Sequence, residues 1–250
     1  MSLRLIEHFS RVLIPVARRH QVYRPFLTCL FHNDYCQKSL QMRSISTATG
    51  SYTSPGIFQN LVHNIKLQFK KYKLKAAGYH LYESVADNVD YHSFLKEFRM
   101  PDTFHSWFLV TELHVWMLMS MLMAEPKYGR YIRNSMVEAM WSDVSARAKK
   151  LCNEQPSLIK SQIHELSEEF QAALVNYDEG LLSNDTVLAG AIWRRFLMRS
   201  QSCSAQDLEV MVKYIRKSML LLDQWNIEVF LKEKTIKWTP LKDIYDGLPR

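Results

Sequence analysis

One continuous apolar segment, residues 104–123, constrains the fold of this chain more than any other feature. Glu112 is its only charged residue, and apolar side chains recur all round the 3.6-residue period of a helix. Such a helix lies either in a protein core or in a membrane. The stretches free of Glu and His are too short to cross about 30 Å of hydrocarbon, so we predict a buried core helix. Pro101 disfavours helix just before this segment, and Asp102 or Thr103 can cap its first turn.

Two ionisable residues of this segment, His105 and Glu112, are seven positions apart and therefore lie on the same face of the predicted helix. A carboxylate inside an apolar helix must be hydrogen-bonded or neutral, because an isolated buried charge is strongly unfavourable. One hypothesis makes the pair a proton-handling or ligand site. The other, which we favour, makes it a polar pair of the core whose hydrogen bonds are satisfied within the protein.

The composition predicts an all-α protein. Glycine and proline are scarce, at 7 and 8 of 250 residues, whereas the helix formers Leu, Met, Ala, Lys and Glu are common. The apolar content of 47% is sufficient for a large core. We therefore expect a single helical bundle-like domain over residues 51–250, with a C-terminal tail anchored by Trp238, after an N-terminal segment of different character.

Residues 1–50 have the character of a mitochondrial transit segment that is removed from the mature protein. They hold seven basic and two acidic side chains, so they carry +5 of the net charge of +7. Arg4, Arg11 and Arg18 recur every seven residues on one face of a predicted helix whose opposite face is apolar. Basic amphipathic segments that are rich in Ser and poor in acid are typical of mitochondrial targeting. A basic tail with no targeting role is the alternative.

A second basic segment begins with the helix predicted from about Ile57. Its apolar stripe is bordered by lysines, and no acidic residue occurs between Ile57 and Tyr82. Lysines beside an apolar stripe suit a helix at an anionic membrane surface, and they also suit the phosphates of ribosomal RNA. An ordinary core-facing helix with a solvated basic rim is the third possibility. The lysines concerned are Lys66, Lys70, Lys71, Lys73 and Lys75.

Apolar periodicity and capping residues predict further helices along the rest of the chain. A short amphipathic segment covers about 75–86, and Asp90 caps the helix after it. Ser204 and Asp207 form a capping box at the start of a helix that extends to about Leu231. Between these we expect helices over about 130–151, over 158–177, and after a cap at Asn184 or Asp185.

The connection between the second and third of these helices is predicted to be a loop. Gly180 suits a helix C-terminus, because glycine accepts a left-handed conformation at little cost. Asp178 and Glu179 would then lie in a loop, where binding residues are frequent. Arg194 and Arg195 are plausible ion-pair partners for them. The loop is therefore either a partner-binding site or local turn chemistry with a structural salt bridge.

No catalytic or cofactor-binding constellation occurs in the sequence. It lacks a glycine-rich phosphate loop, a nucleophile elbow and a His-Glu-x-x-His motif, and its Glu and His residues are wrongly spaced for di-iron sites. None of the four cysteines forms a Cys-x-x-Cys, and two of them lie within residues 1–50, which argues against a disulfide scaffold or a zinc site. A base-reading motif is absent too. We therefore expect neither an enzyme nor a DNA-binding protein, and neither a metal nor a cofactor.

Two blocks of the sequence resemble the ubiquinol–cytochrome c chaperone family, the assembly factors of respiratory complex III. The first block reads Met100-Pro-Asp-Thr-Phe-His-Ser-Trp-Phe and is followed by Leu113-His-Val-Trp116. The second reads Tyr177-Asp-Glu-Gly180-Leu-Leu-Ser, then Asp185, then Leu188-Ala-Gly-Ala-Ile-Trp193-Arg194, with Gly190 where the pattern has Ala. The order and separation of the blocks also fit the family, and the resemblance covers about 57–239.

This resemblance implies a non-enzymatic role at the matrix side of the mitochondrial inner membrane. Family members act with a small partner assembly protein, as a heterodimer, and engage the mitochondrial ribosome and nascent cytochrome b, which they stabilise until assembly. The resemblance supplies no catalytic residues. The motif residues, expected to be structural or partner-binding, are Pro101, Asp102, Phe104, Trp107, Phe108, His114, Trp116, Tyr177, Asp178, Glu179, Gly180, Asp185, Trp193 and Arg194.

The surface that would hold such a client is not evident from the sequence. The Met- and aromatic-rich run from Trp107 to Met123 offers adaptable apolar contacts if the core helix leaves it exposed, since Met side chains repack easily. The alternative to a chaperone is a helical mitochondrial enzyme, or a lipid- or quinone-binding protein, that uses a His105/Glu112 pocket. A mitochondrial RNA-binding protein is a third possibility.

Overall fold

The computed structural model describes the backbone of residues 55–151, 156–198, 200, 203–225, 230 and 236–245, and the side chains of all of these except 55–69, 156–158 and 245. Every regular element in this part of the chain is a helix, which confirms the all-α prediction. The transit segment predicted for residues 1–50 lies outside the described residues. The helices are α4 (Pro55–Asn88), α5 (Tyr91–Glu97), α6 (Phe104–Met123), α7 (Gly129–Leu151), α8 (Pro156–Leu182), α9 (Asp185–Arg195), α10 (Ala205–Asp223) and α12 (Lys242–Tyr245).

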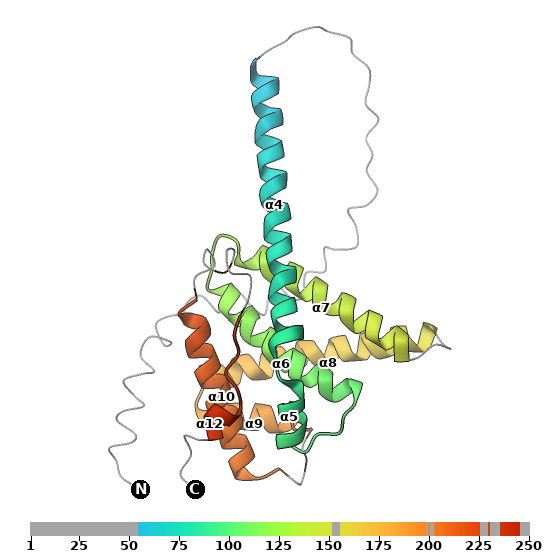
Figure 1. The fold of residues 1–250 in the computed structure, drawn as a ribbon, viewed down its shortest axis with the longest axis vertical. Coiled ribbons are helices and arrows are strands. Elements are labelled where there is room, and N and C mark those ends of the chain that lie inside the picture. Colours follow the sequence, from blue (N-terminus) through green and yellow to red (C-terminus); the bar gives the residue numbers. More distant parts are fainter. Residues whose placement is uncertain are drawn as a thin grey trace. The chain divides into compact units, whose positions relative to one another are not determined.

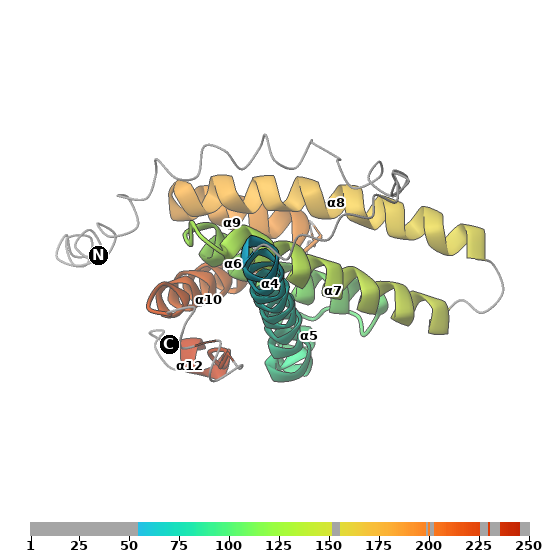
Figure 2. The same ribbon diagram turned by 90° about the horizontal axis from the view of Figure 1, so that it is seen from above.

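The chain divides into two compact units, Met1–Lys73 and Leu74–Arg250, so that α4 begins in the first unit and ends in the second. The second unit is a bundle built around α6, which packs against α5, α7, α8 and α10 (Figure 1). Figure 2 gives the view from above, in which α6 again lies between α7, α8 and α10. The functional residues discussed below belong mostly to this bundle.

Helix α6 is the buried core helix that the sequence predicts. It has the length and apolar character of a membrane span, but 83% of its apolar window is buried inside the protein. Every residue from Phe108 to Ser120 is buried. Thr103 rather than Asp102 caps the helix, since its side chain accepts a hydrogen bond from the amide of Ser106. Burial on all sides follows from an apolar sequence on all sides.

Polar caps at helix N-termini follow the sequence closely. Asp90 caps α5 and Asn184 caps α9, each by accepting an amide hydrogen bond from three residues ahead. The predicted capping box of α10 is present: Ser204 and Asp207 bond reciprocally to each other's backbone amides. The guanidinium of Arg99, whose backbone is left-handed with φ of 53°, also binds the Asp207 carboxylate. This contact ties the α5–α6 connection to the start of α10.

Two helix boundaries differ from the predictions. The separate segment expected over 75–86 is wrong, because α4 continues without interruption to Asn88. Gly78 lies inside α4 where a Cβ atom would come within 2.6 Å of the Ile132 carbonyl oxygen of α7. Glycine at this position therefore allows close helix packing and does not end the helix. Helix α10 stops at Asp223, short of Leu231, with Gln224 as its C-cap.

The C-terminal tail crosses the bundle as an anchored segment. The indole Nε1 of Trp238 donates to the carbonyl of Ser84 at 3.1 Å, and the side-chain amide of Asn88 donates to the carbonyl of Ile236 at 3.1 Å. The edge of the Trp238 ring also packs against His114 of α6, with ring centroids 4.6 Å apart. The prediction of a Trp-anchored tail is confirmed, and the tail connects the end of α4 to the core.

Candidate functional site

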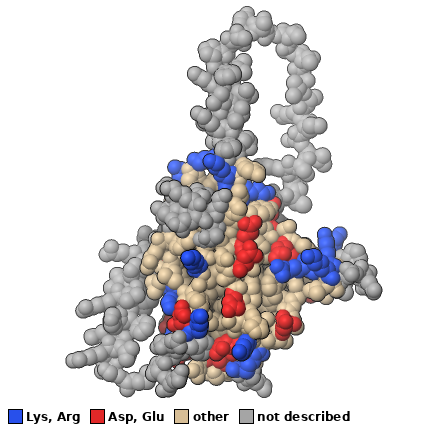
Figure 3. All heavy atoms as spheres, in the orientation of Figure 1, with Lys and Arg blue, Asp and Glu red and all other residues tan. Residues whose placement is uncertain are grey.

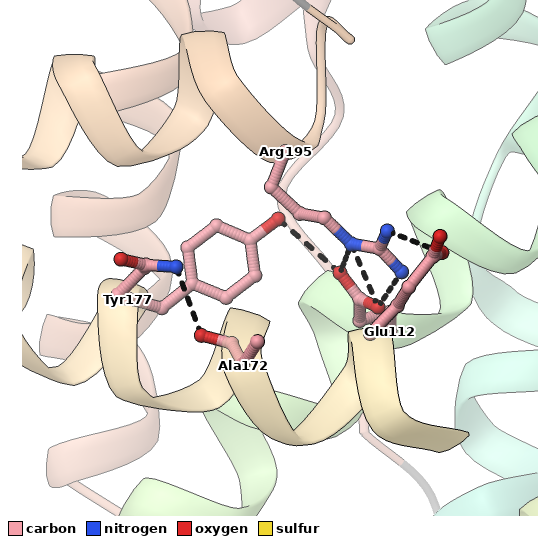
Figure 4. Close-up of polar contacts among 6 residues, drawn as sticks. Glu112, Ala172, Tyr177 and Arg195 are labelled. Atoms are coloured by element: carbon pink, nitrogen blue, oxygen red, sulfur yellow. Dashed lines mark hydrogen bonds and ion pairs between the residues drawn. The ribbon is translucent and has the colours of Figure 1, made fainter. Parts of the chain in front are cut away.

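Glu112 is fully buried at the centre of the bundle, and its carboxylate is bonded on both oxygens. Arg195 of α9 donates from Nη2 to one oxygen at 2.6 Å and from Nε to the other at 2.9 Å. The hydroxyl of Tyr177 of α8 donates to the same carboxylate at 3.4 Å. Figure 4 shows the guanidinium and the phenol converging on Glu112 from separate helices. This cluster joins α6, α8 and α9, and it leaves neither carboxylate oxygen of Glu112 without a partner.

Burial and pairing act in opposite directions on this cluster. Loss of water raises the pKa of Glu112 to about 7, although the adjacent Arg195 lowers it. Burial also raises the pKa of the Tyr177 hydroxyl well above its ordinary value. Arg195 has a second partner, since its Nη1 lies 2.8 Å from the carboxylate of Glu169. A guanidinium that binds two carboxylates fixes α9 to its neighbours. It does not release its proton in a protein, so it cannot act as a general acid.

His105 does not complete a pocket with Glu112. It is half-buried, and burial together with the nearby Arg195 lowers the pKa of its imidazole. The partners of Glu112 are Arg195 and Tyr177, which lie 83 and 65 positions away in the sequence. Glu112 is thus a satisfied core polar group, but the predicted pairing with His105 is wrong. The sequence indicated Arg195 as a partner for a carboxylate, but for Asp178 or Glu179 and not for Glu112.

Asp178 occupies a helix, and the predicted loop around it is wrong. Helix α8 continues through Asp178 and Glu179 to Leu182. The Asp178 carboxylate accepts a hydrogen bond from the indole Nε1 of Trp116 at 2.8 Å, and burial raises its pKa to about 6. The predicted ion pairs with Arg194 and Arg195 are also wrong, because Arg195 binds Glu112 and Arg194 is exposed. Trp116 and Asp178, from the two sequence blocks, therefore meet in space.

Gly180 permits α8 and α9 to pack closely. A Cβ atom at this position would lie 2.7 Å from the Cα of Leu188 and 3.0 Å from its Cδ1. Gly180 is helical and buried, so the predicted left-handed C-terminus is wrong. The helix ends two residues later, and Asn184 begins α9. The second sequence block is thus a tight helical hairpin.

His114 connects α6 to α10 and to the tail. Its Nδ1 lies 2.7 Å from the carbonyl of Val110, so this nitrogen carries the hydrogen, and Nε2 accepts from the hydroxyl of Tyr214 at 2.6 Å. Complete burial lowers the pKa of His114 to about 4. A neutral imidazole in this position is a structural link between three elements.

The start of α6 carries an aromatic cluster at the edge of the core. Phe108 is fully buried, while Phe104 and Trp107 are half-buried and tilted against each other, with centroids 5.5 Å apart. The guanidinium of Arg147 from α7 lies 4.3 Å from the Trp107 ring, which is a cation–π contact. Pro101 and Asp102 are exposed before this cluster. The first block therefore has a buried half and a surface half.

The remaining motif residues lie on the surface. Glu179, Asp185, Trp193 and Arg194 are exposed, and Trp193 retains 39% of its accessible area. Asp185 pairs with Arg216 of α10 at 3.1 Å. These positions can bind a partner, whereas Phe108, His114, Trp116, Tyr177 and Gly180 serve the core.

The lysines of α4 fall into three groups. Lys70, Lys71 and Lys73 are exposed in the first unit, next to Tyr72, which retains 73% of its accessible area. Lys75 is half-buried and forms an ion pair with Glu138 of α7 at 2.9 Å. The side chain of Lys66 lies outside the described residues. Figure 3 shows basic side chains gathered near the middle of α4 and at the end of α7.

The flank of α6 is not the client surface considered above. Its Met and aromatic side chains from Phe108 to Met119 are buried among the other helices, so they have no access to a client. Trp107 at the start of the run and Met121 and Met123 in the last turn are half-buried. An apolar contact surface must therefore be sought elsewhere on the bundle.

The described part of the chain has no cluster of three or more His, Cys, Asp or Glu residues suited to a metal ion. A groove of about 670 Å³ lies between α5 and the tail, with Phe94, Tyr214 and Trp238 among its lining residues. It does not include Glu112. The geometry is that of a helical scaffold whose buried polar groups connect the helices.

Comparison with known proteins identifies the family of this chain. The family model described as ubiquinol–cytochrome c chaperone matches residues 96–238. The chain belongs to this family. Its members are chaperones, so the chain is not an enzyme, and the resemblance seen in the two sequence blocks is confirmed.

Relatives of this chaperone-family chain carry related names. It is 49% identical over 175 residues to ubiquinol–cytochrome c reductase complex assembly factor 1 of Drosophila melanogaster, covering 68% of this chain and 67% of that protein. It is 29% identical over 160 residues to the mitochondrial protein CBP3 of Saccharomyces cerevisiae, covering 63% of this chain and 47% of the yeast protein. The match thus spans about half the length of the yeast relative.

A solved structure has the same fold. The crystal structure of the Cbp3 homolog from Brucella abortus superposes with a TM-score of 0.60 and covers 71% of this chain and 97% of that one. The two sequences are 16% identical over this match. At this identity the likeness concerns the arrangement of helices alone.

Proposed function

We propose that this chain is a mitochondrial assembly factor of the ubiquinol–cytochrome c reductase complex. Family membership, with assembly factors among the relatives, is the observation that carries this proposal. The basic amphipathic character of residues 1–50 supports a mitochondrial location independently. The chain acts without catalysis, and binding is its whole contribution.

Its client is newly synthesised cytochrome b, which it binds together with a small partner assembly protein at the mitochondrial ribosome and the matrix side of the inner membrane. The buried clusters at Glu112, Trp116 and His114 support this role, because they make a stiff scaffold that can present fixed surfaces. Exposed motif residues such as Asp102 and Trp193 are available to partners. A chaperone for a very apolar subunit needs such surfaces and no chemistry of its own.

A pulse of radiolabel during mitochondrial translation, followed by immunoprecipitation of the full chain, tests this client. Preferential recovery of labelled cytochrome b is the expected result. Recovery of no translation product, with the protein intact and folded, would contradict it. Exchange of Trp193→Ser, a half-exposed motif residue, should reduce recovery more than Tyr131→Ser, a similarly exposed residue of α7 outside the motif blocks.

The lysines of α4 hold the chaperone at a phosphate-bearing surface. Lys70 and Lys73 are one turn apart on one side of α4, while Lys71 and the exposed ring of Tyr72 lie on its other sides, and a basic exposed segment of this kind suits an anionic membrane interface. Lys75 is committed to Glu138 and contributes less.

Reversal of these three charges to Glu should release the protein from cardiolipin-containing vesicles. Reversal of Lys149, Lys150 and Lys160, which are also exposed, is the control for net charge and should have little effect. Loss of ribosome cosedimentation with unchanged vesicle binding would assign the lysines to ribosomal RNA. Unchanged sedimentation with both surfaces would remove this part of the proposal.

A further inference from the structure

The hydrogen bonds that anchor the C-terminal tail go to a single helix. The main chain of Ile236 bonds to the side chains of Ser84 and Asn88 in α4, and the indole of Trp238 donates to the Ser84 carbonyl. In the described part of the chain, no hydrogen bond joins residues 236–241 to α10. Helix α12 of the tail nevertheless packs against α10, as Figure 2 shows. The tail is thus bonded on one flank and only packed on the other.

A small cavity of about 10 Å³ lies between α10 and the tail. Ser218 and Leu222 line it from α10, and Lys237 and Thr239 line it from the tail. This volume corresponds to about one sphere of the radius of a water molecule, which is the lower limit for a single bound water. The cavity is therefore too small for an organic ligand and large enough for one water.

Two residues that line this cavity have hydroxyl oxygens shielded from solvent. Ser218 is 2% exposed, and neither its Oγ nor Oγ1 of Thr239 has a hydrogen bond of regular geometry to a residue that the structure describes. The hydroxyl of Tyr214, one turn before Ser218, interacts with the Ser218 side chain but donates its own proton to His114. A buried hydroxyl without its hydrogen bonds is unfavourable. Both oxygens therefore indicate a small polar partner.

We propose that one structural water occupies this cavity and bridges Ser218 Oγ to Thr239 Oγ1. A hydroxyl can donate one hydrogen bond and accept others, so each residue can bind the water in either sense. The main-chain groups of Lys237, which form no hydrogen bond to the described residues, offer a third partner. About three such partners are typical of a buried water. The bridge supplies the polar link between α10 and the tail that direct bonds do not.

This water also fixes one wall of the groove between α5 and the tail. Trp238 and Thr239 line both the small cavity and the groove of about 670 Å³. With the water in place, polar contacts continue from His114 through Tyr214 and Ser218 to Thr239. The groove wall is then attached to the core on both flanks. The inference concerns the tail alone and does not depend on which client the chain binds.

The sign of a stability change distinguishes a bridged pair from two unpartnered hydroxyls. Ser218→Ala and Thr239→Val should each lower the melting temperature of the full-length chain by about 2–4 °C, because each removes one partner of the water. Removal of a buried hydroxyl that had no partner would instead raise the melting temperature, since its desolvation no longer opposes folding. Thermal unfolding followed by circular dichroism measures both variants.

A double variant tests whether the two hydroxyls share one water. Ser218→Ala/Thr239→Val should lower the melting temperature by clearly less than the sum of the two single effects, because both residues serve the same ligand. Ser135→Ala is the matched control. Ser135 is a buried serine of α7 whose hydroxyl donates to the Tyr131 carbonyl at 3.1 Å. Its effect should add to that of Thr239→Val without coupling.

Magnetisation transfer from water to amide protons in the isotope-labelled full chain detects the ligand directly by nuclear magnetic resonance. A cross-peak from a long-lived water is expected at the amide of Lys237, and the double variant should lack it. Single variants that raise the melting temperature, effects that add as in the control, or no cross-peak in the parent chain would each overturn the proposal. A loss of stability for Ser218→Ala with Thr239→Val unchanged would assign Ser218 to Tyr214 and contradict the bridge.

Discussion

Substitution of alanine for two glycines should have opposite effects on stability. An exposed helical Gly→Ala exchange normally stabilises by about 1 kcal/mol, because glycine loses more backbone entropy on folding. At Gly190 the new Cβ meets only the end of the flexible Arg194 side chain, at 3.2 Å. At Gly180 it would lie 2.7 Å from the Cα of Leu188, which cannot move without separating α8 from α9.

The magnitudes follow from these contacts. Overpacking of a closely packed interface costs about 1–3 kcal/mol, and contact with backbone places Gly180→Ala toward the upper end of that range. After the helix-propensity gain of about 1 kcal/mol, we expect a net loss of about 1–2 kcal/mol for Gly180→Ala. Gly190→Ala should gain about 0.5–1 kcal/mol.

Urea unfolding followed by far-UV circular dichroism measures both variants against the parent chain. The expected result is a lower midpoint for Gly180→Ala and a higher one for Gly190→Ala, with the slope of the free energy against urea unchanged. Two midpoints that shift together, or a stabilised Gly180→Ala, would refute the close α8–α9 packing at this glycine.

Two further predictions concern the buried polar groups. Arg195→Met should lower the free energy of unfolding by about 3–5 kcal/mol, because Glu112 stays buried without its cation. The double variant Glu112→Leu/Arg195→Met should recover much of this loss. Urea unfolding of both variants measures these changes, and an unaffected single variant would contradict the buried pair. His114 has a pKa of about 4 in the folded chain against 6.5 when free, so at this residue the unfolded state binds more protons between these values, and the contribution of His114 to stability should fall by up to about 1.4 kcal/mol per unit as pH drops from 6.5 to 4. The raised pKa values of Glu112 and Asp178 act in the opposite direction over part of this range, so the test is the difference between the parent chain and His114→Gln. Melting curves of the parent and of His114→Gln across this range test it, and equal slopes would show that His114 does not stay neutral.

Much of the fold follows from local sequence signals. The buried state of α6, the cap at Asp90 and the capping box at Ser204 were predicted, and the caps at Thr103 and Asn184 were each one of two adjacent candidates. Each depends on residues within a few positions of one another, whose spacing on a helix is fixed by its geometry. The family was predictable for the same reason, since its two blocks are contiguous stretches of sequence.

The contacts within the candidate site did not follow from the sequence. Asp178 was expected to pair with Arg194 or Arg195, whereas its partner is Trp116 in the other block, 62 positions away. Gly180 was expected to end a helix, but it lies within one because Leu188 packs against it. A local rule that glycine ends helices is outweighed when a neighbouring helix needs the space of its missing side chain.

The sequence by itself determined which segments become helices, where most of them begin, and that α6 must be buried, because these properties depend on short-range periodicity and on apolar surface. Only the tertiary structure decided that Arg195 rather than His105 binds Glu112, and that Trp116 of one sequence block meets Asp178 of the other. Pairings between helices depend on how the helices cross, and the residues near Glu112 in the chain do not indicate which helix will lie beside Glu112.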